Sequence, residues 1–173
     1  TSGVLVLTKT QEAHALLKLA FQEHQVQKTY LAFVYGVLAE PRGIIDFAIG
    51  RSRKDFRLRS AQPKAKGQMR EAITRFEAVS DIGTHTLVKL MPETGRTHQI
   101  RVHLKAIHHP VVCDPLYAPN HPCNLGFSRL GLHAYQLDIT LLSGKRVLIT
   151  APVPEDLAVA LRKFPKTADL IVS

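Results

Sequence analysis

The stretch ETGRTHQIRVHL, residues 93 to 104, is the part of the sequence richest in side chains that could do chemistry. Within it, TGRTHQIR places a glycine, two hydroxyls, a histidine, an amide and two guanidinium groups close together. The apolar residues here follow a helical period, and we expect a helix that begins just after Gly95 and stops before Pro110. Free N–H groups and the dipole at such a helix start favour an anion. Residues 96 to 99 are therefore predicted to bind phosphate.

Four histidines, His98, His103, His108 and His109, raise the question of a metal site. The five-residue step from His98 to His103 turns the two side chains onto different helical faces, and no glutamate accompanies them as in H-E-x-x-H. We therefore expect no metal. The histidines are expected to be neutral, partly exposed, and bonded to RNA phosphate or to backbone.

The first residues, TSG, allow another kind of chemistry, because an amino-terminal threonine can act as a nucleophile with its own α-amine as base. Nothing in the sequence requires Thr1 to be the natural terminus, and the net charge suits RNA better than a peptide substrate. A Thr1 amidohydrolase is the weakest of the functional hypotheses.

The charge balance makes nucleic acid the first partner to test. The sequence has 23 Lys and Arg against 14 Asp and Glu, which gives a formal net charge of +9. A basic surface that is only solvated and has no function would have the same composition. The densest part, residues 51 to 70, is expected to be a mobile basic loop or ribbon. RNA affinity should fall steeply with salt. Charge removal should weaken it at Arg51, Arg53, Lys54, Arg57 and Arg59.

The two cysteines, Cys113 and Cys123, form neither a disulfide framework nor a zinc-site spacing, so we expect free thiols in a reducing cytoplasm. No window approaches about 18 apolar residues, and no charged leader precedes an apolar stretch at the amino end. These observations predict a soluble, cytoplasmic protein without a membrane partner.

The amino-terminal part is expected to contain a strand and a helix. The run up to Leu7 is of strand type, and Thr8 with Gln11 resembles a capping box. Apolar residues then recur at helical spacing as far as Phe21, so the helix should bury one face and end near His24.

Most of the remaining sequence reads as strands. Single strands are expected at 28–36 and 43–50, hairpins at 71–79 with 84–92 and at 132–141 with 145–152, and a last helix at 154–164. Strands outnumber helices and neighbour one another, which favours an α+β fold with a largely antiparallel sheet. No linker or repeat divides residues 1–173, so a single domain is expected.

Five segments resemble, in order and spacing, the RluA-type family of pseudouridine synthases: TSGVLVLTK, KTYLAFVYG, AITRFEAV, ETGRTHQIRVHLKAIHHPVVCDPLY and LHAYQL. The resemblance implies a catalytic domain with a bent, mainly antiparallel mixed sheet flanked by helices. It also implies an isomerase that detaches a uridine base in structured RNA, rotates it and reattaches it through C5, without a cofactor. Ribosomal RNA is the commonest target in the family, ahead of transfer RNA, and a monomer is expected.

The resemblance also assigns site residues. Tyr30 matches the tyrosine that stacks on the target base, and Arg101 matches the arginine that pairs with the catalytic Asp. That Asp belongs to the motif R-L-D-x-x-T-S-G, so its place is three residues before Thr1, and residues 1–173 are expected to lack an amino-terminal portion of the domain and to be inactive by themselves. The residues expected to bind RNA are Lys28, Arg51, Arg53, Arg96, Thr97, His98, Gln99 and His103.

The sequence departs from the family pattern at two positions, and one alternative function stays open. His109 and Cys113 stand where many relatives carry glycine. The alternative is a non-catalytic RNA-binding module derived from the same fold, which would bind RNA without isomerising it.

Overall fold

The computed structural model describes residues 1–53, 55–63 and 65–170, so Lys54, expected to contribute to salt dependence, lies outside the described residues. The helices are α1 (Gln11–Gln22), α2 (Gln99–Ala106), α3 (Glu155–Leu161) and the short 3-10 helix η1 (Ala168–Leu170). The larger sheet contains β1 (Ser2–Gly3), β2 (Gln27–Tyr35), β3 (Arg42–Asp46), β7 (Ile73–Asp81), β8 (His85–Pro92), β9 (Leu132–Thr140) and β10 (Arg146–Thr150). The smaller sheet contains β4 (Ile49–Arg51), β5 (Arg59–Ser60) and β6 (Lys66–Arg70).

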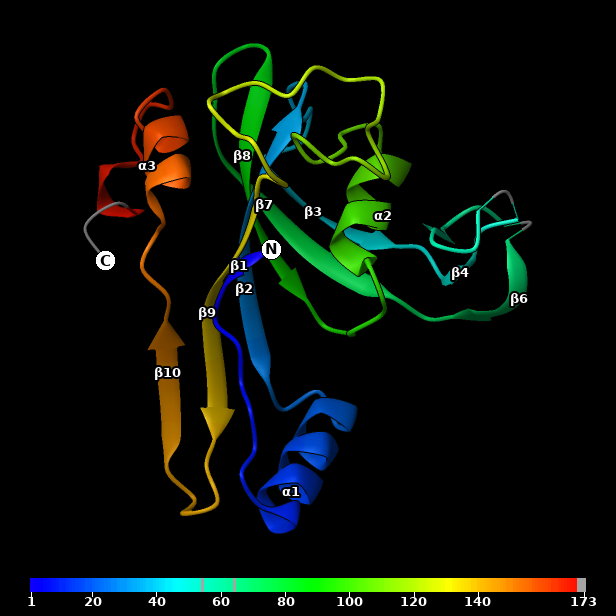
Figure 1. Ribbon diagram of the computed structural model, residues 1–173, viewed down its shortest axis with the longest axis vertical. Helices are drawn as coiled ribbons and strands as arrows, with labels where there is room; N and C mark the ends of the chain where they lie inside the picture. Colours follow the sequence, from blue (N-terminus) through cyan, green and yellow to red (C-terminus); the bar gives the residue numbers. More distant parts are fainter. Residues whose placement is uncertain (54, 64, 171–173) are drawn as a thin grey trace.

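The larger sheet has the order β1-β9-β2-β8-β7-β3, and β10 continues the pairing along β9 (Figure 1). β1 pairs with β9 in parallel, whereas the other strand pairings in the described part of the chain are antiparallel. The predicted α+β fold with a mainly antiparallel, mixed sheet is therefore confirmed.

The central strand β2 is buried on both faces, which explains its nearly continuous apolar sequence. Leu31 and Phe33 point into a core that α3 covers, while Ala32 and Val34 point into a second core that α2 covers. Figure 1 shows the two helices on the sheet near the same end, with α1 at the opposite end. The sheet thus holds α2, and the motif that leads into it, on one face.

The amino-terminal part differs from the prediction. The strand ends at Gly3 instead of Leu7, and the side chain that caps α1 is that of Thr10, which accepts a hydrogen bond from the Ala13 amide at 3.1 Å. No residue of α1 is buried, so the prediction of a buried helical face is wrong. The helix lies outside the two cores on either side of β2 and contacts a small cluster around Val26 and Leu137 through Ala20, so Leu16, Leu19 and Phe21 remain exposed.

The segment 43–50 is divided between the two sheets. β3 pairs with β7 in the larger sheet, and the chain then passes Phe47 into β4, which pairs with β5 and β6. Within the basic segment 51–70, Arg51, β5 and β6 belong to the small sheet and the other described residues are loop, so the segment combines the predicted loop and ribbon. The two later hairpins and the last helix lie where the sequence predicts them.

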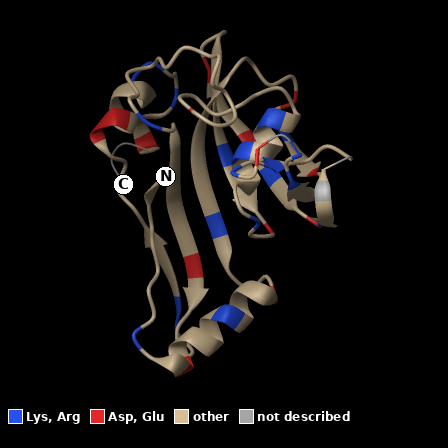
Figure 2. Ribbon diagram, turned by 45° about the vertical axis from the view of Figure 1, so that its right-hand side comes forward, with Lys and Arg blue, Asp and Glu red and all other residues tan. Residues whose placement is uncertain are grey.

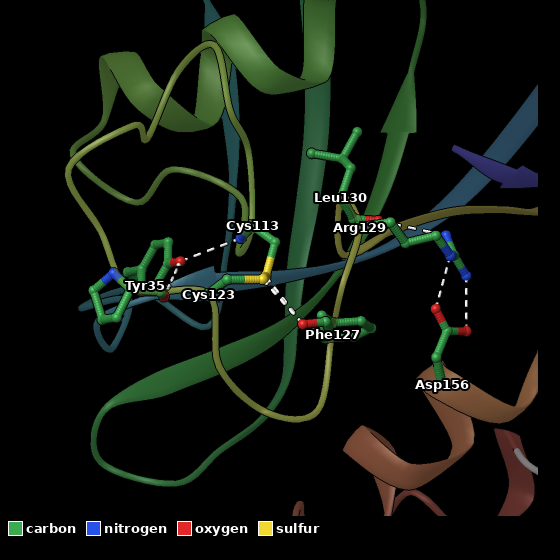
Figure 3. The surroundings of a disulfide bond; sticks show 8 residues. Tyr35, Cys113, Cys123, Phe127, Arg129, Leu130 and Asp156 are labelled. Atoms are coloured by element: carbon green, nitrogen blue, oxygen red, sulfur yellow. Dashed lines mark hydrogen bonds and ion pairs between the residues drawn. A yellow bond between two sulfur atoms is a disulfide. The ribbon is translucent and has the colours of Figure 1, made fainter.

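Cys113 and Cys123 form a disulfide, so the prediction of two free thiols is wrong (Figure 3). The Tyr35 hydroxyl accepts a hydrogen bond from the Cys113 amide at 3.2 Å and donates one to the Pro122 carbonyl at 2.8 Å. The Tyr35 hydroxyl therefore joins the two ends of the loop 113–123, which the disulfide closes. Cys113 also has a left-handed backbone, with φ of 56°, a conformation that only glycine adopts without strain.

Candidate active site

A cleft of about 390 Å³, called the central cleft below, lies between β2, the start of α2 and the chain before β9. Its lining brings together both predicted catalytic residues and several predicted RNA contacts. The lining residues are Thr1, Lys28, Tyr30, Pro92, Thr94, Gly95, Arg96, His98, Gln99, Ile100, Arg101, Leu130 and Leu132.

Tyr30 reaches this cleft from the middle of the sheet. It pairs with Leu90 of β8 and with Ala134 of β9, and the register with β9 shifts between Thr29 and Tyr30. Such a bulge commonly redirects a side chain beside a site. Burial raises the pKa of Tyr30, so the phenol is protonated at neutral pH and presents a ring and an O–H group.

The residues TSG lie along β9, with Ser2 and Gly3 paired to it in parallel. The Ser2 hydroxyl lies 2.9 Å from Nδ1 of buried His133, whose Nε2 lies 3.4 Å from the Ala151 carbonyl. Because a carbonyl only accepts, Nε2 carries the proton and Ser2 donates to Nδ1. Burial lowers the pKa of His133, which keeps this imidazole neutral. Ser2 is thereby fixed against β9, and Thr1 lies in the lining of the cleft.

Arg101 is held by a buried carboxylate. Its Nε and Nη2 donate to the two oxygens of Asp114 at 2.7 and 2.6 Å, and its guanidinium carbon lies 4.8 Å from the centre of the Tyr117 ring. Asp114 Oδ1 also accepts the Leu116 and Tyr117 amides, each at 2.9 Å. Burial would raise the pKa of Asp114, but these hydrogen bonds outweigh it and lower the pKa. The guanidinium thus has a fixed orientation, and Asp114 leaves its Nη1 unused.

His98 links the central cleft to the ribbon. It takes the left-handed conformation directly before α2, with φ of 59°, and its Nδ1 lies 3.0 Å from the Tyr117 hydroxyl. That hydroxyl accepts the Arg59 amide at 2.9 Å and can donate to Nδ1, which places the imidazole proton on Nε2. Burial, followed by the charges of Arg101 and Arg59, lowers the pKa of His98.

Gln99 holds the loop that leads into α2. Its Oε1 accepts the Thr94 hydroxyl at 2.7 Å and the Arg96 amide at 2.9 Å, while its Nε2 donates to the Ile73 carbonyl and the Thr74 hydroxyl, both at 3.0 Å. The Arg96 amide is therefore already paired, and the Gln99 amide donates to the Arg96 carbonyl at 3.0 Å, which leaves the predicted phosphate site at 96–99 with two backbone donors fewer. With all its groups used inside the protein, Gln99 positions the loop.

His103 also has a structural role. It is 0% exposed, its Nδ1 lies 2.9 Å from the Thr74 hydroxyl, and its Nε2 donates to the Phe47 carbonyl at 3.0 Å. Burial lowers its pKa, so the ring is neutral. The prediction of partly exposed histidines is wrong for His103, and neither His103 nor Gln99 offers a group to RNA in this structure.

The other predicted RNA contacts lie in or beside the central cleft. Lys28 donates to the Thr94 carbonyl at 3.1 Å, and Arg96 lies on the loop between the clefts. A second cleft of about 500 Å³, the ribbon cleft, lies between the small sheet and the same loop; it is lined by Ile49, Gly50, Arg51, Arg59, Gly67, Gln68, Arg70, Gly95, Arg96 and Thr97. Arg53 instead lines a separate hollow behind the ribbon. Figure 2 shows Lys and Arg positions gathered near α2 and the small sheet.

Sequence reasoning missed the residues that hold Arg101. Asp114 and Tyr117 belong to the DPLY segment, which contributes to the family resemblance without indicating a role. An Asp among apolar residues, shortly after a helix that contains Arg101, was the signal that could have suggested the ion pair. Arg70 of the ribbon cleft was also missed.

Two further findings concern metal binding and membrane-spanning helices. The described residues contain no cluster of three or more His, Cys, Asp or Glu side chains arranged to bind a metal ion. None of the helices in the part of the chain that the structure describes has the length and apolar character needed to span a membrane.

Comparison with known proteins agrees with the geometry. A family model described as RNA pseudouridylate synthase matches residues 1–106. Ribosomal large subunit pseudouridine synthase D of Neisseria meningitidis serogroup B is 38% identical over 168 residues, 91% of this chain and 44% of that protein. Dual-specificity RNA pseudouridine synthase RluA of Yersinia pestis is 42% identical over 142 residues, 81% of this chain and 66% of that protein.

A solved structure shares the fold. Human RNA Pseudouridylate Synthase Domain Containing 1 superposes with a TM-score of 0.76 at 28% identity, covering 95% of this chain and 71% of the human one. The chain spans about half the length of the curated relatives it matches.

Proposed function

Because the chain belongs to the RluA-type RNA pseudouridine synthase family, we propose that it forms most of the catalytic domain of an enzyme that isomerises a uridine in structured RNA. The bond between C1′ of the ribose and N1 of the base breaks, the base rotates, and a bond between C1′ and C5 forms; C5 loses its proton and N1 gains one, so the product is an isomer. The base must first leave its stack, which costs a few kcal/mol and is easiest in loops or distorted helices.

One observation carries the proposal: Tyr30, Arg101 and Thr1 line the same cleft. A carboxylate three residues before Thr1 is within about 10 Å of chain from it, because an extended residue spans at most about 3.3–3.6 Å. Such an Asp could therefore reach the cleft that holds Tyr30 and Arg101. The Arg101 Nη1 that Asp114 does not use would be its partner.

The two residues have different roles in this proposal. The Tyr30 ring stacks on the target base, and its hydroxyl, protonated at neutral pH, is a donor for the detached base. Arg101 orients the upstream carboxylate at the sugar and favours its ionised form. Lys28, Arg96 and His98 line the same cleft and are proposed to contact phosphates of the RNA.

The substrate and the setting complete the proposal. Ribosomal RNA is the proposed target, ahead of transfer RNA, since relatives named for the ribosomal large subunit are among the matches. We expect the protein to act as a monomer in the cytoplasm.

The test uses the natural protein that includes the residues before Thr1. Incubated with transcribed ribosomal RNA, it should form pseudouridine, detected by chromatography of the digested RNA, while residues 1–173 alone should bind RNA and form none. In the longer protein, Arg101→Ala should lower the rate, and Tyr30→Phe should lower it with little loss of RNA affinity because the ring remains. If no Asp lies three residues before Thr1, or no RNA is modified, the chain is instead a non-catalytic RNA-binding module.

A further inference from the structure

Two clefts flank the central cleft, and all three share Gly95 and Arg96 in their linings. The ribbon cleft lies on one side. The other, called the α1 cleft below, has a volume of about 540 Å³ and lies between α1 and the loop 94–96. Since the central cleft is proposed to hold the target uridine, the neighbouring clefts are where the adjoining nucleotides would lie.

The ionisable groups that line the α1 cleft are all basic. They are His14, Lys18, His24, Lys28 and Arg96, and the lining contains no Asp or Glu. His24 donates from Nδ1 to the Glu93 carbonyl at 2.8 Å, and Lys28 donates to the Thr94 carbonyl at 3.1 Å, so both are anchored to the loop. Such a lining attracts a polyanion and repels a basic partner.

An aromatic ring completes this cleft. Phe21, on the last turn of α1, is 40% exposed and lines the cleft, and the Lys28 ammonium lies 5.8 Å from its ring centre. An open ring next to cationic groups is the arrangement that proteins use for single-stranded nucleic acid, because bases stack on the ring while phosphates meet the charges.

We propose that the α1 cleft is a subsite for a nucleotide adjacent to the target uridine, with its base on Phe21 and its phosphate held by Lys18 and Arg96. This inference rests on the proposed function, since it assumes an RNA substrate in the central cleft. Arg96, at the junction of the three clefts, would contact the backbone between the target and its neighbour.

The experiment measures the affinity of the chain for fluorescein-labelled RNA stem-loops with a uridine in the loop, by anisotropy. Phe21→Ala should weaken binding about 5- to 150-fold, the range found for loss of one base–aromatic stack. The matched control is Leu19→Ala on the same helix, because Leu19 is 52% exposed and lies outside the cleft. Circular dichroism checks that each variant folds. If Phe21→Ala does not fold, Phe21→Leu, which keeps the bulk but not the aromatic ring, is measured instead.

A second arm separates stacking from charge. Lys18→Gln should reduce the slope of log affinity against log salt by about 0.7, whereas Lys163→Gln, an exposed lysine after α3, should leave it unchanged. The Phe21→Ala loss should disappear on an RNA made abasic at one of the two positions beside the uridine, since the base that stacks is then absent.

The outcomes distinguish the two proposals. Failure of every variant and of the unmodified chain to bind RNA would refute the proposed function itself. RNA binding that is equal for Phe21→Ala and Leu19→Ala would overturn only the subsite and would leave the apolar side of α1 as a surface for a protein partner. Persistence of the Phe21→Ala loss on both abasic RNAs would also overturn the subsite.

Discussion

Replacing Asp114 by Asn should destabilise the protein strongly although the side chain keeps its shape. The Arg101–Asp114 ion pair lies under the central cleft, with the Asp114 side chain 0% exposed and that of Arg101 13% exposed. In Asp114→Asn an NH2 group replaces one of the two oxygens that accept from Arg101, so two donors would face each other. Arg101 would also be left as a nearly buried charge without a counter-ion.

The magnitude follows from this burial. Breaking a buried ion pair from one side costs about 3–5 kcal/mol, because an uncompensated charge remains. Most single domains have an unfolding free energy of only about 5–15 kcal/mol, so the loss is a large part of the total. Urea unfolding at pH 7, followed by circular dichroism, should show a much lower midpoint with a similar slope. Adding Arg101→Met should recover part of the loss, since both charges are then removed.

A second ion pair in the same chain provides the control. Arg146 contacts both carboxylate oxygens of Asp138, at 2.8 and 3.0 Å, with the same fork geometry, but at the exposed edge of the sheet. Water screens this pair, so Asp138→Asn should change the urea midpoint little. Equal effects of Asp114→Asn and Asp138→Asn, whether small or large, would refute the reasoning from burial.

Three further predictions concern histidines, a glycine and the disulfide. Burial lowers the pKa of His103 and His133 below the value near 6.5 of the unfolded chain, so the unfolded state binds more protons in acid. The free energy of unfolding, measured by urea titration, should therefore fall as the pH drops below about 6.5, by up to about 1.4 kcal/mol per pH unit for each histidine. In Gly3→Ala the new Cβ would overlap the Ala134 carbonyl, so the variant should lose the β1–β9 pairing, seen as faster amide exchange in residues 2–4. Cys113→Ser opens a disulfide loop and should cost up to about 3 kcal/mol under oxidising conditions but almost nothing under reducing ones.

Local patterns in the sequence were sufficient for much of the fold. The two hairpins and α3 have strong periodicity and turn residues between them, and the structure has them at nearly the predicted positions. The dense residue types of the motif at 93–104 likewise predicted a site, and Arg96, His98 and Gln99 of that motif line the central cleft, whereas the role of Arg101 was predicted from the family resemblance. These features depend on neighbours in the sequence, which is why they could be predicted.

The features that were not predicted depend on contacts distant in the sequence. His103 is polar and lies among basic residues, yet Thr74 and Phe47 provide partners for both of its nitrogens and allow its burial. The loop closed by the disulfide is held by the Tyr35 hydroxyl, which comes from a strand far earlier in the chain, with a separation of 78 from Cys113. No periodicity in the sequence encodes such meetings.

The parallel pairing of β1 with β9 also has a consequence for the order in which the protein assembles. Ser2 precedes its hydrogen-bond partner His133 by 131 positions, and β2, which lies beside β9, pairs with β8 on its other edge. The wall of the central cleft that contains Thr1 can therefore form only after β9 has left the ribosome. Contacts this distant are slow to form, so the segment around Ser2 has to wait unpaired while most of the sheet is built.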